Sequence, residues 1–106
     1  MPTLKNHRLV NADFQSAYGW YEQECTGLGL EFAGEFRRAY HKLRQGPLLY
    51  AARFSGIRRL NLDRFPYGIF YVANADEIRV LAVLHGSRET KRILSERRRT
   101  FPTDAS

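Results

Sequence analysis

The sequence predicts an α+β fold: a short N-terminal strand, an antiparallel hairpin of two helices packed on a small antiparallel β-meander, and a short basic C-terminal helix. Apolar residues recur about every 3.6 positions between residues 14 and 43, and between residues 57 and 84 they alternate or form continuous runs. Helices that precede the strands, rather than alternating with them, are typical of the α+β class. At 106 residues the chain has the size of one domain. We therefore assign residues 1–106 to a single domain with a loose tail from about residue 100.

The helical period predicts a first amphipathic helix over residues 12–25 and a second helix that ends before Gly46 and Pro47. The apolar stripe of the first helix consists of Phe14, Ala17, Tyr18 and Tyr21, and that of the second consists of Phe32, Phe36, Ala39, Tyr40 and Leu43. Only a short break at Gly27 separates the helices, so we expect them to run antiparallel. Ahead of them, residues 8–10 are predicted to form a short edge strand.

Three strands are predicted over residues 57–65, 69–73 and 78–84, joined by turns at Pro66 and at the sequence NADE. The last strand is apolar at both its odd and its even positions, apart from Arg79. This pattern is typical of a central strand covered on both faces. The three strands in sequence order predict an antiparallel meander.

The helical hairpin is expected to cover one face of this sheet and to leave the other short of cover. The following helix, predicted over residues 88–99, offers only Ile93 and Leu94 for docking. The residues expected to lie open are either Val80, Ala82 and Leu84, or their neighbours Leu81 and Val83. An open apolar face of this kind predicts a partner protein that covers it.

The chain is basic, with 17 Lys and Arg against 11 Asp and Glu and a net charge of +6; 14 of the 17 basic residues are arginines. Arginine suits phosphates and carboxylates, so the bias favours an RNA, DNA or acidic protein partner, although a GC-rich genome would produce the same bias. A lone Cys25 excludes an internal disulfide and a cysteine-based zinc site, which favours the cytoplasm. No segment is long and apolar enough to span a membrane. The three histidines, His7, His41 and His85, are too scattered to predict a metal site, and no cofactor motif is present.

Four segments in this order resemble the RelE/ParE toxin superfamily of bacterial toxin–antitoxin modules, and most closely its ParE-like or plasmid-stabilisation branch. They are residues 27–32 (GLGLEF), 57–59 (IRR), 64–71 (RFPYGIFY) and 80–88 (VLAVLHGSR). The resemblance extends over about residues 7–90. It implies a toxin that a cognate antitoxin, ParD-like or similar, neutralises by forming a hetero-oligomer with it.

Two mechanisms exist within the superfamily. ParE-like toxins inhibit DNA gyrase, whereas RelE-like toxins cleave mRNA on the ribosome with basic residues around the phosphate. RelE has a lysine pair on its sheet and a tyrosine near its C-terminus. Here no lysine lies on the predicted meander and no tyrosine follows Tyr71. We therefore favour a gyrase inhibitor that is not an enzyme, with an mRNA endoribonuclease as the alternative. A degenerate toxin that only binds its antitoxin and helps to repress their operon is a third possibility.

If the chain were RelE-like, the candidate catalytic residues are His85 as base or acid and Arg59 and Arg88 as charge stabilisers. The candidate partner-binding residues are Arg58, Arg59, Arg64, Trp20, Leu81, Val83 and Arg88. Some of these residues have an alternative role. For His85 the alternative is packing within the fold or contact with the antitoxin. For Arg64 it is stabilisation of the turn at Pro66, and for Trp20 it is packing at the edge of the apolar stripe of the first helix. Arg58 and Arg59 are adjacent on a strand and so must point to opposite faces.

Overall fold

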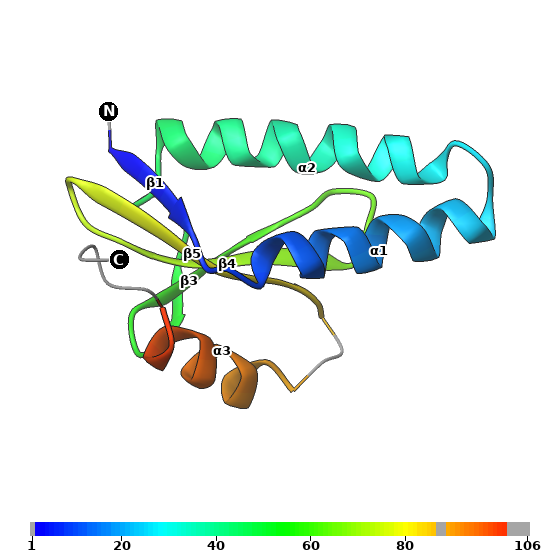
Figure 1. Cartoon of the computed structure of the whole chain (residues 1–106). Helices are drawn as coiled ribbons and strands as arrows, with labels where there is room; N and C mark the ends of the chain where they lie inside the picture. The colour runs from blue at the N-terminus through cyan, green and yellow to red at the C-terminus, as the bar shows by residue number, and fades with distance from the viewer. Residues whose placement is uncertain (1, 87–88, 102–106) are drawn as a thin grey trace.

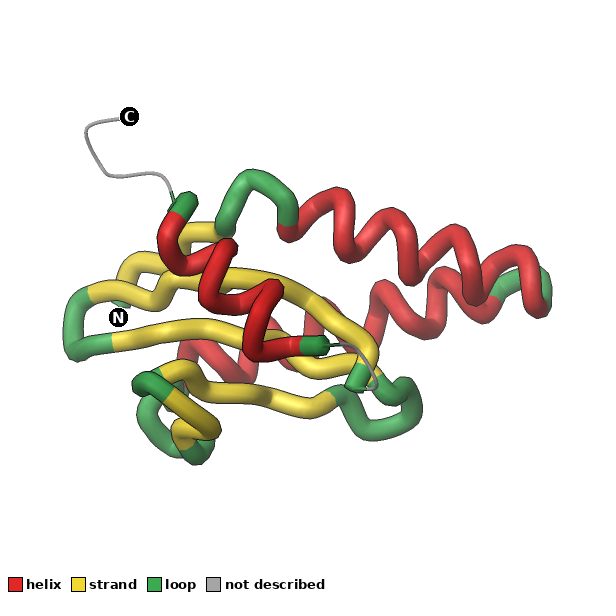
Figure 2. Tube along the Cα trace, turned by 90° about the horizontal axis from the view of Figure 1, so that it is seen from below, coloured by secondary structure: helices red, strands yellow, loops and turns green. Residues whose placement is uncertain are grey.

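The computed structural model describes residues 2–86 and 89–101. Its elements in chain order are β1 (Thr3–Asn6), α1 (Val10–Glu24), α2 (Leu28–Gln45), β2 (Ala52–Phe54), β3 (Ile57–Asn61), β4 (Tyr67–Ala73), β5 (Glu77–His85) and α3 (Thr90–Arg99). Helices α1 and α2 lie on one side of the sheet and α3 lies on the other (Figures 1 and 2). The predicted fold class is therefore confirmed: a short strand precedes two helices, the other strands follow them, and one short helix comes last.

The α1–α2 turn is held by backbone geometry and by one carboxylate. Gly27 has a φ of 92°, a left-handed conformation that favours glycine. The Glu22 carboxylate accepts hydrogen bonds from the N–H groups of Gly27 and Gly29, both at 3.0 Å. These N–H groups lie at the start of α2, where the backbone donors have no partner within the helix. The end of the hairpin is thus tied together by α1 itself.

The predicted meander forms the centre of a larger sheet whose strand order is β1-β5-β4-β3-β2. Strands β3, β4 and β5 pair antiparallel as expected, and β1 pairs parallel with β5. The prediction of an edge strand at residues 8–10 was wrong, because the strand lies at Thr3–Asn6 and α1 already begins at Val10. Strand β2 was not predicted, and β3 ends at Asn61 rather than at Phe65.

Strand β5 carries a β-bulge that sets the direction of its side chains. Phe70 pairs with Ala82 and Tyr71 pairs with Val80, so Leu81 is the extra residue. Leu81 and Ala82 both pack in the cluster under α3, whereas Val80 packs in the cluster under the helical hairpin. Strand β5 is apolar at both alternating sets of positions because helices cover both of its faces. The bulge shifts the alternation of every later residue by one position.

The expectation that Val80, Ala82 and Leu84, or Leu81 and Val83, lie open on one face of the sheet was wrong, because all five are buried. Leu81 is 0% exposed under α3, and Val83 is 2% exposed under the hairpin. Leu94 of α3 is itself fully buried against the same face as Leu81. The two candidates for partner binding on β5 are therefore core residues in this fold, and α3 covers the part of the face that contains them.

An ion pair that is largely shielded from solvent anchors α3 to the rest of the domain. The Arg97 guanidinium contacts both carboxylate oxygens of Asp13 on α1, at 2.8 and 2.9 Å. Arg97 also donates to the Leu81 carbonyl at 3.0 Å, and Asp13 accepts from the Val83 N–H at 3.0 Å. Since β1 pairs with β5 only as far as Val80, the ion pair satisfies backbone groups of β5 beyond the end of β1. No helix in the described part of the chain is long and apolar enough to cross a membrane.

Candidate functional site

The adjacent residues Arg58 and Arg59 on β3 point to opposite faces of the sheet, as predicted. Arg58 lies opposite Tyr71, which packs under the hairpin, and Arg59 lies opposite Phe70, which packs under α3. Side chains directly opposite each other on antiparallel strands share a face. Arg58 donates to the Tyr50 carbonyl at 2.6 Å, so it holds the segment between α2 and β2. Arg59 is left as the arginine of this pair on the α3 side.

Arg59 lies flat across the sheet. Its guanidinium carbon is 5.1 Å from the centre of the Phe70 ring, and its Nε donates to the Asn61 side chain. The absence of a side chain at Gly68 makes this possible, because a Cβ there would lie 2.7 Å from Nε of Arg59. Burial and the charge of Arg53 lower the pKa of Arg59 from its ordinary value. None of the ion pairs within residues 2–86 and 89–101 includes Arg59. Its guanidinium is thus placed to receive an anionic group of a partner.

Arg64 makes contacts of the structural kind that was the alternative to partner binding. Its guanidinium pairs with Glu31 at 3.0 Å and with Glu35 at 3.3 Å, both on α2. The Glu35 carboxylate also accepts the backbone N–H groups of Asp63 and Arg64. Burial raises the pKa of Glu35, but these N–H groups and the Arg64 guanidinium outweigh that effect and hold it below its usual range. The cluster ties the loop after β3 to α2.

His85 lies on the hairpin side of the sheet, at the end of β5. It pairs in register with Tyr67, and the two rings meet edge-on with centroids 5.3 Å apart. Tyr67 packs against the core cluster under the hairpin. The side chains of His85 and Arg59 therefore start from opposite faces of the sheet, although a Cβ at Gly86, the residue after His85, would lie 3.1 Å from Nη2 of Arg59. Arg88, the third catalytic candidate, lies outside the described residues.

Trp20 is exposed and lies near the end of α1. It is 57% exposed, and its ring meets Tyr21 edge-on at 5.2 Å, which holds one side of the indole. An exposed Trp with a supported ring is suited to anchor a partner.

A second exposed apolar site was missed at the sequence level. Leu48 and Leu49 follow α2 and are 53% and 83% exposed, beside a hollow that Pro2 and Pro47 also line. The sequence did contain a signal for this site. Two leucines stand directly after the Gly-Pro that ends the helix, outside any periodic pattern. In the part of the chain that the structure describes, no group of three His, Cys, Asp or Glu residues is placed to hold a metal ion.

The fold agrees with the expected resemblance to a toxin of a bacterial toxin–antitoxin module. A family model described as the ParE toxin of the type II toxin–antitoxin system parDE matches residues 4–90. The chain is therefore a type II toxin by class. Within that class it belongs to the ParE toxin family.

A solved structure described as the chromosomal ParDE TA system from P. aeruginosa contains a chain of the same fold. The TM-score is 0.70 at 24% sequence identity, and the match covers 80% of this chain and 96% of that chain. This likeness supports the fold assignment. A search of curated proteins found no significant match.

Proposed function

We propose that the chain is a cytoplasmic inhibitor of DNA gyrase that acts by binding rather than by catalysis. The observation that carries this proposal, beside membership of the ParE toxin family, is the placement of Arg59 and His85 on opposite faces of the sheet. Cleavage of RNA by attack of a 2′-hydroxyl needs an acid or base and a charge-stabilising cation around one phosphate. A surface that binds a protein target does not need such convergence.

The proposal includes a ParD-like antitoxin that binds the toxin directly and prevents its action. Support comes from the solved structure of similar fold, which is described as a ParDE system. The exposed apolar groups Trp20, Leu48 and Leu49 give this chain surfaces on which a partner would bury area. The net charge of +6 would speed encounter with an acidic partner.

The experiment that tests the proposal is DNA gyrase supercoiling with the purified chain titrated in, with and without the small protein encoded beside its gene. We expect dose-dependent inhibition that the second protein relieves. The His85→Ala variant should inhibit as strongly as the wild type, because the histidine has no catalytic part in this mechanism.

Unchanged supercoiling, together with translation arrest that His85→Ala abolishes, would replace the proposal with an mRNA endoribonuclease. Absence of any growth arrest on expression without the antitoxin would instead indicate a protein that only binds its antitoxin.

A further inference from the structure

We propose that the end of the sheet face left uncovered by α3 is a docking site for an acidic, apolar peptide segment of the antitoxin. One apolar side chain would pack on Val72, and a neighbouring carboxylate would meet Arg98. The inference rests on the proposed function, because it requires that an antitoxin binds this chain.

The hollow results from a difference in length between the helix and the strand beneath it. Helix α3 has 10 residues, which is about 15 Å at the rise of an α-helix. Strand β5 has 9 residues, which is about 30 Å at the rise of a β-strand. The helix therefore cannot cover the whole length of β5, and the end nearest the β4–β5 turn stays open.

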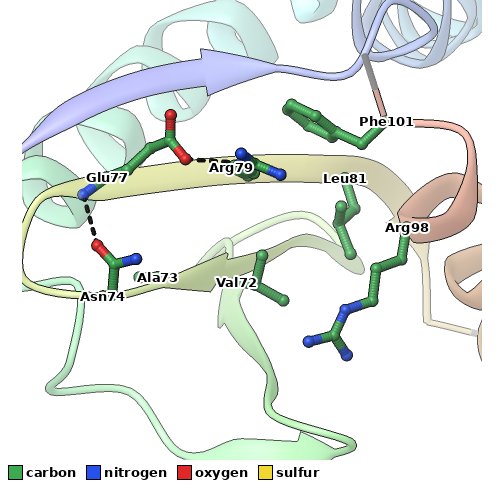
Figure 3. A pocket seen from close by; sticks show the side chains of 8 residues that line it. All are labelled: Val72, Ala73, Asn74, Glu77, Arg79, Leu81, Arg98 and Phe101. Carbon is green, nitrogen blue, oxygen red and sulfur yellow. Dashed lines mark hydrogen bonds and ion pairs between the residues drawn. The ribbon is translucent and has the colours of Figure 1, made fainter. Parts of the chain in front are cut away.

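The open end is hollowed to a volume of about 410 Å³, which falls within the size of ordinary ligand sites, about 300–1,000 Å³. Its lining comes from the β4–β5 hairpin and from the end of α3, as Figure 3 shows. The lining residues are Val72, Ala73, Asn74, Glu77, Arg79, Leu81, Arg98 and Phe101.

The two arginines of the hollow differ in how they are neutralised. The Nε of Arg79 lies 2.6 Å from the Glu77 carboxylate, and its guanidinium is 5.3 Å from the centre of the Phe101 ring. Arg98 reaches across from α3 and donates to the Ser55 carbonyl. None of the ion pairs among the described residues includes Arg98. The hollow thus presents one cation that lacks a carboxylate beside half-buried Val72.

This combination fits an acidic peptide better than a nucleic acid. A nucleic-acid backbone binds a track of cations through successive phosphates, whereas Arg79 in this hollow is already paired with Glu77, which leaves Arg98 as its cation without a carboxylate among the described residues. A peptide needs only one carboxylate for Arg98 and one apolar side chain for the floor formed by Val72. Burial of that apolar side chain would supply most of the affinity, and the charge pair would set the register.

The test uses two variants of the full chain on different elements and one matched control. Arg98→Glu reverses the cation of the hollow, and Val72→Phe fills its floor without changing charge. Arg92→Glu is the control, because Arg92 lies on the same helix, has a side chain 76% exposed, and contacts only Glu89, at 3.9 Å, among the described ion pairs. The probe is the small protein encoded beside the chain's gene, and the dissociation constant is measured by calorimetry.

We expect Arg98→Glu and Val72→Phe each to raise the dissociation constant about tenfold or more, and Arg92→Glu to change it less than about threefold. All three variants should still inhibit gyrase when the antitoxin is absent. Equal weakening by Arg98→Glu and Arg92→Glu would mean that only overall charge matters and would overturn the proposal. Wild-type binding by Val72→Phe would also overturn it. Failure of the proposed function is seen separately, because the wild-type chain would then bind no antitoxin or leave gyrase active.

Discussion

The buried pair between Asp13 and Arg97 should make a large contribution to the stability of the domain. Both side chains are only 12% exposed, and both carboxylate oxygens are engaged by the guanidinium. We consider the substitution Arg97→Met, which keeps much of the side-chain volume and removes the charge. It leaves the Asp13 carboxylate buried without its partner and removes the donor to the Leu81 carbonyl.

The size of the effect follows from what is left behind. Removing one partner of a buried ion pair typically costs about 3–5 kcal/mol, because the remaining charge has lost its solvation and its counter-ion. The Val83 N–H still donates to Asp13, which offsets part of that cost. We therefore expect Arg97→Met to lower the free energy of unfolding by about 3 kcal/mol, a large share of the about 5–15 kcal/mol of an ordinary domain.

Urea unfolding at neutral pH measures this effect, and the m-value shows whether the two states keep their compactness. The control is Arg99→Met, on the same helix, because Arg99 pairs with Glu96 on the surface with both side chains mostly exposed. That substitution should change the unfolding midpoint little. The double variant Asp13→Asn with Arg97→Met should be more stable than the sum of the single changes predicts. Equal midpoints for Arg97→Met and Arg99→Met would refute the reasoning.

Three further predictions concern single side chains. Burial lowers the pKa of His7, and the charges of Arg97 and Arg8 act in the same direction. The unfolded chain therefore takes up the proton first, and the free energy of unfolding should fall as the pH drops below about 6.5. The melting temperature of the wild type should fall with pH in this range, and that of His7→Gln should not. An equal dependence on pH in both proteins would contradict the role given to His7. Glu35→Gln should cost about 1–2 kcal/mol at neutral pH, measured by urea unfolding. The difference should shrink as the pH falls below 4.5, the ordinary pKa of this carboxyl, and a cost independent of pH would count against a role for its charge. Gly68→Ala should displace the Arg59 guanidinium, since the new Cβ would lie 2.7 Å from its Nε. We expect this variant to inhibit gyrase more weakly while its stability stays close to that of the wild type. Unchanged inhibition would show that Arg59 does not contact the target.

The helical hairpin and the meander were predictable because each rests on a repeated local pattern. The stripe from Phe14 to Leu43 has the helical period, and β4 and β5 are strongly apolar. Strands β1 and β2 were not placed correctly, because they have four and three residues and are largely half-buried or exposed. Sequence patterns that short contain too few positions to establish a period.

The apolar docking residues of α3, Ile93 and Leu94, were predicted correctly, but its ion-pair anchor to α1 could not be predicted because it is not a pattern. Asp13 and Arg97 are 84 positions apart, and each on its own looks like an ordinary charged residue on a helix. The expectation that Val80, Ala82 and Leu84, or Leu81 and Val83, lie open followed directly from missing this pair. Arg98 could not be predicted as a residue of the hollow for the same reason. Nothing in the arginine run at positions 97–99 shows which arginine pairs with Asp13 and which one lines the hollow.

The bulge at Leu81 connects the fold to the function. Without the extra residue, strand alternation would continue from Val80 and would turn His85 towards α3, on the face that holds Arg59. The inserted position turns His85 to the hairpin face, against Tyr67. One residue in β5 thus places His85 on the face opposite to that of Arg59, although RNA cleavage would need both groups around one phosphate. This separation is not readable from sequence alone, because a continuous apolar run gives no sign of where a strand carries an extra residue.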